Sequence, residues 1–245
     1  MDFSKNELTS NEELSNELLR GLNTQFGLAG PDDVLLWGYD TFGTDMVLGT
    51  GFGPSGMFLI YRLWELGIEI PIFFLDTHLL FDETYGLKDK VEERFDIRIT
   101  RVSTRLSLDE QAEEYDEKLW NKDPNKCCYL RKVLPLQNYL SDKKAWITGV
   151  RRSQSETRKN TQYVEWDPDN EVVKLNPLAS YTTEEVWNYI RSKKLPYNPL
   201  HDEGYPSIGC IPCTEAVEQT ASDERAGRWN GSEKTECGIH LSTQK

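Results

Sequence analysis

The sequence has no long apolar run: nowhere do its 245 residues approach the ~20 apolar residues that a bilayer-spanning helix needs. The first residues, MDFSKNELTSNEELSNELLRGL, also have no apolar core of the kind found in export signals. We therefore expect a cytoplasmic protein without a membrane segment. Internal repeats and low-complexity tracts are absent too, and 38% hydrophobic with 28% charged residues is typical of a globular chain.

Positive charge is scarce, since 28 Lys and Arg residues face 41 Asp and Glu residues and leave a net charge of −13. So acidic a chain is not expected to bind nucleic acid. The bases are nevertheless grouped, with four of them in RRSQSETRK (151–159) and two, Arg225 and Arg228, in DERAGRW. A local basic patch suits a small anionic ligand, and solvated surface charge is the alternative that composition leaves open.

Short apolar runs alternate with helical patterns along most of the chain. The expected strands span 45–50, 68–76, 97–102, 145–149 and 171–178. The expected helices span 57–66, 82–94, 107–120, 127–140 and 182–191, after an N-terminal helix that a capping box at Ser10 to Glu13 opens. This alternation predicts an α/β fold with a parallel sheet covered by helices on both faces.

Pro and Gly become frequent from residue 196 onward, and the periodicity fades. We therefore predict one domain over 1–245, with a nucleotide-binding core at 46–195 and a loop-rich C-terminal segment at 196–245 that ends in a mobile tail. Ligands of parallel sheets bind at the carboxyl ends of the strands, where Thr50, Asp76 and Gly149 lie.

The turn TGFGPSG (50–56) joins an expected strand to an expected helix. Backbone N–H groups of such a turn, together with the helix N-terminus, form a cradle for an anion. The turn has neither the lysine of a Walker A loop nor the third glycine of GxGxxG. Taken alone it is a weak signal, because many such turns contain glycine for geometry only.

The cysteines number five, which is odd, so a disulfide framework is not expected in a cytosolic chain. Cys127-Cys128 and Cys210-x-x-Cys213 form two close pairs, and Cys237 stands apart. This arithmetic suggests one four-cysteine metal site and one working thiol. Adjacent cysteines are awkward ligands for a single zinc ion, whereas a [4Fe–4S] cube offers each thiolate its own iron. The pattern favours the cluster, with four buried structural thiols as the alternative.

Several segments carry a family likeness, in order, over roughly 47–240. They are TGFGPSG, FLDTHLLFDETY, CCYLRK, WITGVRRSQSETR, PYNPLHDEGYPSIGCIPC, DERAGRW and KTECGIH. With these segments the chain resembles the assimilatory adenylyl-sulfate and phosphoadenylyl-sulfate reductases. The resemblance implies a PP-loop type, adenine nucleotide alpha hydrolase-like fold. Its paired cysteines resemble those of the iron–sulfur branch, whose substrate is usually adenosine 5′-phosphosulfate (APS).

The resemblance also implies a mechanism. Cys237 would attack the sulfur of APS, AMP would leave, and reduced thioredoxin or a glutaredoxin-like reductant would release sulfite from the cysteine S-sulfonate. Lys234, His240, Arg225 and Arg228 are the cations expected to lower the pKa of the Cys237 thiol. Sulfate assimilation would be the role of the enzyme, and a homo-oligomer stays open.

The site residues follow from the family motifs. The four paired cysteines Cys127, Cys128, Cys210 and Cys213 would hold the [4Fe–4S] cluster. The substrate-binding residues would be Thr50, Gly51, Phe52, Gly53, Ser55, Gly56, Leu75, Asp76, Thr77, Lys132, Gly149, Arg152, Ser155, Arg158, Arg225, Arg228 and His240.

The glycine-rich turn departs from the family pattern of the cluster-bearing members, which often have a more Ser-rich and acidic version. A reductase of the 3′-phosphorylated substrate (PAPS), or one that uses both substrates, is therefore the nearest alternative. PP-loop ATP pyrophosphatases and sulfurtransferases usually carry SGGxDS, whose aspartate TGFGPSG does not have. A non-catalytic iron–sulfur or nucleotide-sensing module is a third reading, and it predicts that Cys237→Ser leaves function intact.

Overall fold

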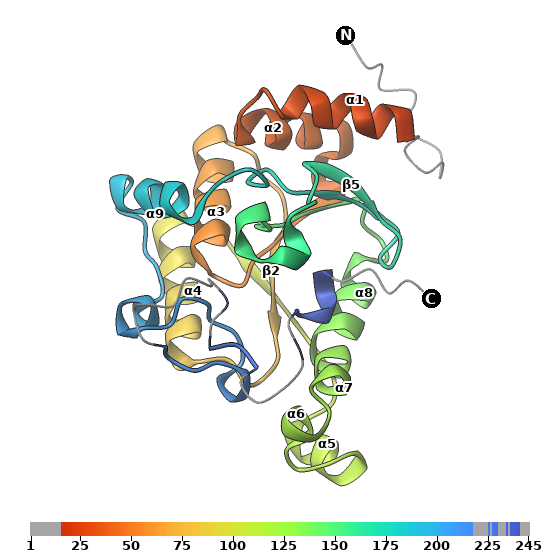
Figure 1. Cartoon of the computed structure of the whole chain (residues 1–245), viewed down its shortest axis with the longest axis vertical. Coiled ribbons are helices and arrows are strands. Elements are labelled where there is room, and N and C mark those ends of the chain that lie inside the picture. Colours follow the sequence, from red (N-terminus) through yellow and green to blue (C-terminus); the bar gives the residue numbers. More distant parts are fainter. Residues whose placement is uncertain (1–15, 218–224, 226, 230–233, 235, 241–245) are drawn as a thin grey trace.

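The computed structural model of the chain describes residues 16–217, together with 225, 227–229, 234 and 236–240 (Figure 1). The capping box expected at Ser10 to Glu13 lies outside these residues. The helix expected after it is present as α1 (Asn16–Phe26), which buries Leu22 and Phe26. No helix in the described part of the chain is both long and apolar enough to span a membrane.

One six-stranded sheet forms the centre of the fold, in the order β3-β2-β1-β4-β6-β5. Its strands are β1 (Met46–Gly49), β2 (Ile72–Asp76), β3 (Ile99–Ser103), β4 (Ala145–Ile147), β5 (Val164–Asp167) and β6 (Val172–Leu175). All neighbouring pairs are parallel except β5 with β6, which is antiparallel. The predicted α/β class is confirmed, and the sheet is mixed because the edge strand β5, which the sequence analysis missed, precedes β6 by a tight hairpin.

The two faces of the sheet are filled by alternate residues of the same strands. In β1, Met46 and Leu48 belong to the larger core, whereas Val47 belongs to the smaller one. Figure 1 shows α3, α4 and α9 on one side of the sheet and α8 on the other. Near-continuous apolar strands are therefore explained by burial on both faces.

The helices occupy nearly the predicted positions, with one addition, α2. Their bounds are α2 (Pro31–Phe42), α3 (Pro54–Leu66), α4 (Asp82–Phe95), α5 (Leu108–Glu114), α6 (Leu119–Lys122), α7 (Pro124–Cys128), α8 (Leu134–Leu140) and α9 (Thr183–Ser192). The predicted helix over 107–120 is wrong in its second half, because α5 ends at Glu114 and α6 begins only at Leu119. The sequence analysis did not predict α2.

One turn of π-helix, Tyr129–Val133, interrupts the helix predicted over 127–140, and we call it the π-turn. The cysteine pair ends α7, and the turn Tyr129–Val133 follows before α8 begins. Pro135 has no N–H to donate to the carbonyl of Arg131, and the N–H of Leu134 bonds to the Tyr129 carbonyl instead. Such turns often occur at functional sites, and this one carries Lys132.

Candidate active site

A cavity of about 300 Å³ opens at the carboxyl ends of β1, β2 and β4. It is the position at which sheets of this kind bind ligands. The predicted site residues that line it are Thr50, Gly51, Phe52, Gly53, Ser55, Gly56, Leu75, Lys132, Gly149, Arg158, Arg225, Arg228 and His240, together with Cys237. Residues far apart in the sequence therefore surround one space.

The glycine-rich turn forms one wall of the cavity. Thr50 is buried, and its hydroxyl accepts a hydrogen bond from the N–H of Phe52 at 3.0 Å. Phe52 has a φ of +58°, which is uncommon for a bulky residue, and its ring packs on Phe74. Gly149, at the end of β4, has to be glycine because a Cβ there would lie 2.8 Å from that of Ser55. The turn, β4 and the start of α3 are therefore packed as one unit.

Arg151 supports this wall from behind. Its side chain is buried, and it donates hydrogen bonds to the hydroxyls of Ser55 (3.0 Å) and Thr183 (3.0 Å). These two residues begin α3 and α9, so one guanidinium joins the starts of both helices. Sequence reasoning missed Arg151 as a site residue, although the basic segment 151–159 was the signal that could have revealed it.

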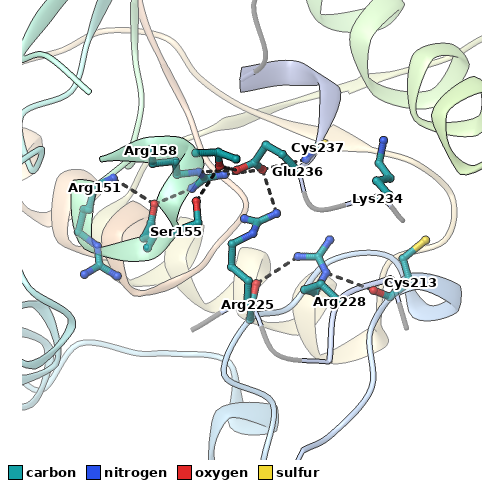
Figure 2. A network of polar contacts seen from close by, with 12 residues as sticks. Arg151, Ser155, Arg158, Cys213, Arg225, Arg228, Lys234, Glu236 and Cys237 are labelled. Atoms are coloured by element: carbon teal, nitrogen blue, oxygen red, sulfur yellow. Dashed lines mark hydrogen bonds and ion pairs between the residues drawn. The ribbon is translucent and has the colours of Figure 1, made fainter. Parts of the chain in front are cut away.

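The opposite wall comes from the π-turn, the basic segment after β4 and the C-terminal segment, and it carries the cations. Lys132, Arg158, Arg225 and Arg228 all line the cavity. Figure 2 shows Arg158 and Arg225 approaching from two sides the carboxylate of Glu236, the residue before the candidate nucleophile. The cations that the motifs predicted are thus brought together, and the Glu236 carboxylate pairs with two of them, Arg158 and Arg225.

Cys237 is buried within this group of cations, with 8% of its surface exposed. A hydrogen bond from Cys128 holds the pKa of the Cys237 thiol well below its ordinary value, and Lys132 and Arg228 act in the same direction against the cost of burial. The same contact raises the pKa of Cys128. A lowered pKa raises the share of the thiolate, which is the form that acts as a nucleophile.

Two of the cations expected to activate Cys237 have other roles in the structure. The prediction of a cationic His240 is wrong, because burial and the charges of Arg158 and Lys174 lower its pKa well below the ordinary value. The neutral ring stacks on Trp146, with ring centroids 5.6 Å apart. Lys234 donates to the Asn125 side chain at 2.6 Å. Lys132, rather than His240 or Lys234, is the first cation that lowers the pKa of Cys237.

A second cavity, of about 260 Å³, lies on the other side of His240. Ile239, His240 and Arg158 line both cavities. The C-terminal turn Gly238–His240 therefore lies between the two cavities, and Gly238 packs closely against Val133 of the π-turn.

The four paired cysteines come from two parts of the chain: Cys127 and Cys128 end α7, whereas Cys210 and Cys213 lie in the C-terminal segment, where Cys210 contacts the loop after β2. The Thr77 hydroxyl and the Cys210 sulfur are 3.2 Å apart, and the N–H of Ile211 donates to the Leu79 carbonyl at 2.7 Å. Burial raises the pKa of Cys127 to about 11, with Cys210 and Cys213 as the next causes. The paired cysteines are therefore close enough to influence one another's ionisation.

Arg131 lies directly behind these cysteines and is the largest fully buried side chain. It donates to the Gln111 side chain at 2.7 Å and to the carbonyls of Thr77 (3.0 Å) and Ser107 (3.1 Å). All of these acceptors are neutral, and no carboxylate of the described residues pairs with this guanidinium. Burial lowers the pKa of Arg131, and only Cys127 and Cys210 oppose that effect.

Within the described residues, no three His, Cys, Asp or Glu side chains are arranged to hold a single metal ion. The four-cysteine cluster therefore stays a prediction at this point. The chemistry of the surroundings bears on it nonetheless, because a buried cation without a carboxylate is costly unless negative charge lies nearby.

Four predicted substrate-binding residues do not line the cavity. Asp76 is fully buried, and its carboxylate accepts from the N–H of His78 and the hydroxyl of Tyr85. Thr77 faces Cys210, as described above. Arg152 points to the Thr161 carbonyl and Ser155 contacts Thr157, and these side chains order the basic segment. A substrate-binding role for these four residues remains an untested prediction.

Other cavity residues were missed, most of them because apolar side chains carry no chemical signal in a sequence. They include Phe73, Leu80, Thr84, Leu136, Trp146, Gln154, Trp187, His201 and the segment 206–209. Apolar and aromatic side chains of this kind give a pocket its shape, and only the fold shows which of them face it.

Comparison with known proteins identifies the family. A phosphoadenosine phosphosulfate reductase domain matches residues 45–216. An adenosine 5′-phosphosulfate reductase of Salinibacter ruber is 52% identical over 244 residues, which cover 100% of this chain and 96% of the relative. A protein of the same name from Staphylococcus epidermidis is 48% identical over 214 residues, with 87% of this chain and 88% of the relative covered.

Solved structures agree with this family. A phosphoadenylyl-sulfate reductase from Candida auris, in a phosphate complex, has a TM-score of 0.73 and 28% identity, covering 85% of this chain and 100% of that one. An FMN adenylyltransferase of Candida glabrata, at 14% identity and a TM-score of 0.56 over 94% of this chain and 79% of that one, shares the fold alone. The resemblance indicated by the motifs is thereby confirmed, and the chain belongs to the phosphoadenosine phosphosulfate reductase domain family.

Proposed function

We propose that this chain is a thioredoxin-dependent adenosine 5′-phosphosulfate reductase that forms sulfite and AMP in sulfate assimilation. The observation that carries the proposal is the thiol of Cys237, buried among Lys132, Arg158, Arg225 and Arg228 on the wall of an anion-sized cavity. The names of the relatives at 48–52% identity agree with it.

The first step is a displacement at sulfur. The Cys237 thiolate attacks the sulfate sulfur of APS, an S–S bond forms, and the bond between that sulfur and the bridging oxygen breaks. AMP leaves with the bonding electron pair on its phosphate oxygen. Cationic neighbours stabilise both the attacking thiolate and the oxygens on which negative charge builds up.

The second step needs two electrons, which a dithiol reductant of the thioredoxin or glutaredoxin type supplies. Its thiolate attacks the sulfur of Cys237, sulfite leaves with the electron pair of the S–S bond, and a mixed disulfide remains. The second thiol of the reductant then attacks this disulfide and returns Cys237 as a thiolate. A reductant could not reach a sulfur that is 8% exposed, so the tail that carries Cys237 has to open between the steps.

The nucleotide is held by the other wall. The turn 50–56 and the N-terminus of α3 present N–H groups to an anion, and Leu75 and Gly149 border the rest of the cavity. Trp187 and Leu80 add apolar surface of the kind that suits a base.

Cys127, Cys128, Cys210 and Cys213 would hold a [4Fe–4S] cluster. The residues fit such a group, because Cys210 and Cys213 influence the ionisation of Cys127, and the buried Arg131 has no carboxylate partner among the described residues. When bound, the cluster supplies fixed negative charge beside Lys132. With Cys128 engaged as a ligand, its hydrogen bond to Cys237 would be lost, and Lys132 and Arg228 would carry the activation of the nucleophile.

The names of the relatives favour APS over PAPS as the substrate. A cytoplasmic location, the division into a core at 46–195 and a C-terminal segment at 196–245, and the oligomeric state remain predictions.

The decisive experiment measures sulfite from APS and from PAPS with reduced thioredoxin, for the wild-type chain and for Cys237→Ser. We expect sulfite from APS at a higher kcat/KM than from PAPS, and none from Cys237→Ser, which should keep its fold and its iron. A large preference for PAPS would make the chain a PAPS reductase, and full turnover by Cys237→Ser would refute the mechanism. A brown protein with about four iron per chain is expected from anaerobic purification, since a [4Fe–4S] cluster holds four.

A further inference from the structure

Glu236 is the residue before the candidate nucleophile, and it is among the least exposed acidic side chains, at 2%. One of its oxygens accepts the Nε–H of Arg158 at 2.8 Å, and the other accepts from Nη2 of the same guanidinium at 2.8 Å. Nη2 of Arg225 pairs with this second oxygen at 2.9 Å. Figure 2 shows the carboxylate between the two arginines. We call these three residues the clamp.

The clamp also holds the nucleophile. The backbone N–H of Cys237 donates to the second carboxylate oxygen of Glu236 at 2.8 Å. Arg158 belongs to the basic segment that follows β4, so the peptide of Cys237 is tied to a part of the chain 78 residues away. A carboxylate that accepts a bidentate guanidinium pair and a peptide N–H has a fixed orientation.

The clamp balances charge behind the cavity wall. Arg158 and Arg225 line the cavity, whereas Glu236 does not. Burial and the repulsion of Arg158 lower the pKa of Arg225 to about 10, and Glu236 opposes both effects. Burial also works against the ionisation of Glu236, but the two arginines outweigh it and lower its pKa. The carboxylate therefore removes one positive charge from the wall that faces the substrate.

We propose that Glu236 is a positioning residue for the reaction, which orients the peptide of Cys237 through the clamp and weakens the binding of the nucleotide anion. The inference rests on the proposed function, because it takes Cys237 as the nucleophile and an adenine nucleotide as the ligand. It predicts two opposite effects: loss of the carboxylate should tighten the binding of AMP and slow the formation of the S-sulfonate.

The test variant is Glu236→Gln, which keeps the shape and removes the charge. We expect AMP to bind about 3- to 10-fold more tightly, since one negative charge near the anion is gone. The rate of S-sulfonate formation in a single turnover, followed by the mass of the intact chain, should fall about 10- to 100-fold because Cys237 is no longer oriented. A merely structural carboxylate would weaken binding and rate together.

Two further variants complete the experiment. Glu92→Gln removes the same charge from α4. Glu92 accepts hydrogen bonds from Lys88 and from the N–H of Ile99, the first residue of the edge strand β3, and it does not line the cavity. This variant should leave AMP affinity and rate unchanged. Glu236→Asp keeps the charge on a shorter side chain, so AMP affinity should stay at the wild-type value while S-sulfonate forms more slowly.

The outcomes separate this inference from the proposed function. A wild-type chain that forms no S-sulfonate from APS would remove the proposed function itself. A wild-type chain that does, beside a Glu236→Gln variant with unchanged or weaker AMP binding, would overturn the role of Glu236. If Glu236→Gln does not fold, Glu236→Asp decides: an unchanged rate of S-sulfonate formation contradicts the inference.

Discussion

Two arginine groups flank the cysteines, and their charges are balanced in opposite ways. In front, Arg158 and Arg225 share the carboxylate of Glu236. Behind, Arg131 is 1% exposed and donates only to neutral acceptors on α5 and on the loop after β2. The front group carries its own counter-charge, and the rear group does not.

The difference indicates where each group finds its anion. A buried cation without an anionic partner costs several kcal/mol of stability in general, on the order of 3–5 when a pair is broken. In the front group Glu236 offsets part of the positive charge, so the cavity does not need a bound anion to be stable. In the rear group Arg131 has no such partner, and a permanent negative charge at Cys127 and Cys210, the two groups that raise its pKa, would stabilise it. This is the charge that a resident cluster on those thiolates would supply.

The largest effect is expected from breaking the rear group. Arg131→Met leaves three acceptors without a donor, two of them buried, and should destabilise the iron-loaded protein by about 3–5 kcal/mol. The iron-free protein should lose less, because there the buried charge has no anion to stabilise. Iron per chain and thermal midpoints before and after iron removal measure both.

Arg94→Met is the control for that experiment. Arg94 bonds the Lys194 carbonyl at the surface, so its loss should change neither quantity. Equal destabilisation of the loaded and iron-free forms of Arg131→Met would show that Arg131 serves only its neutral acceptors.

The next effect concerns the front wall. A Cβ at Gly209 would lie 2.3 Å from Nη2 of Arg228, so Gly209→Ala has to push that guanidinium aside. Because only the end of a flexible side chain moves, stability should hardly change. We expect kcat/KM for APS to fall about 10-fold, which corresponds to about 1.4 kcal/mol of transition-state stabilisation.

Gly86→Ala is the matched control, since nothing lies within 4 Å of a Cβ at that position in α4. It should keep the full kcat/KM and gain slightly in thermal midpoint, as helical Gly→Ala changes do. An unchanged kcat/KM in Gly209→Ala would place Arg228 outside the reaction.

A smaller effect is expected in the arm α5–α7, which projects from the body in Figure 1. A variant there tests whether order in the arm supports the cysteines. Ser107 caps α5 in a reciprocal capping box with Glu110, and its carbonyl accepts from Arg131. Ser107→Ala should cost about 1 kcal/mol, or about 2–4 °C in thermal midpoint.

The equivalent cap of α9 gives the comparison. Thr182 and Glu185 form the same capping box away from the cysteines, so Thr182→Ala should cost a similar amount of stability. Only Ser107→Ala should also lower iron retention. Equal iron in both variants would mean that order in α5 does not support the cysteines.

The smallest expected effect is a pH dependence of the clamp. The pKa of Glu236 is lowered from the ordinary 4.5, so its carboxylate contributes stability above that value and loses it as the pH falls through the folded-state pKa. The difference in unfolding midpoint between wild type and Glu236→Gln should be constant from about pH 6 to 8 and vanish at acid pH. A difference that persists in acid would mean that shape, not charge, stabilises the clamp.

Much of the fold could be predicted because its signals are local. The capping boxes at Ser107 and Thr182, the glycine-rich turn and the apolar runs of β1 and β2 involve neighbours within a few residues. The break after Glu114 escaped because no Gly or Pro lies between 115 and 123. The π-turn had a signal in Pro135, which the helical pattern on both sides of it outweighed in the prediction.

The sequence by itself determined the α/β class, every strand but the edge strand β5, the two cysteine pairs and the solitary Cys237. Only the tertiary structure decided that Arg151, not Arg152, belongs to the cavity wall, and that burial lowers the pKa of His240, whose ring stacks on Trp146. The physical reason is that ionisation and ion pairing depend on burial and on groups brought from far along the chain. Glu236 and Arg158 are 78 residues apart, and no local sequence pattern indicates their contact.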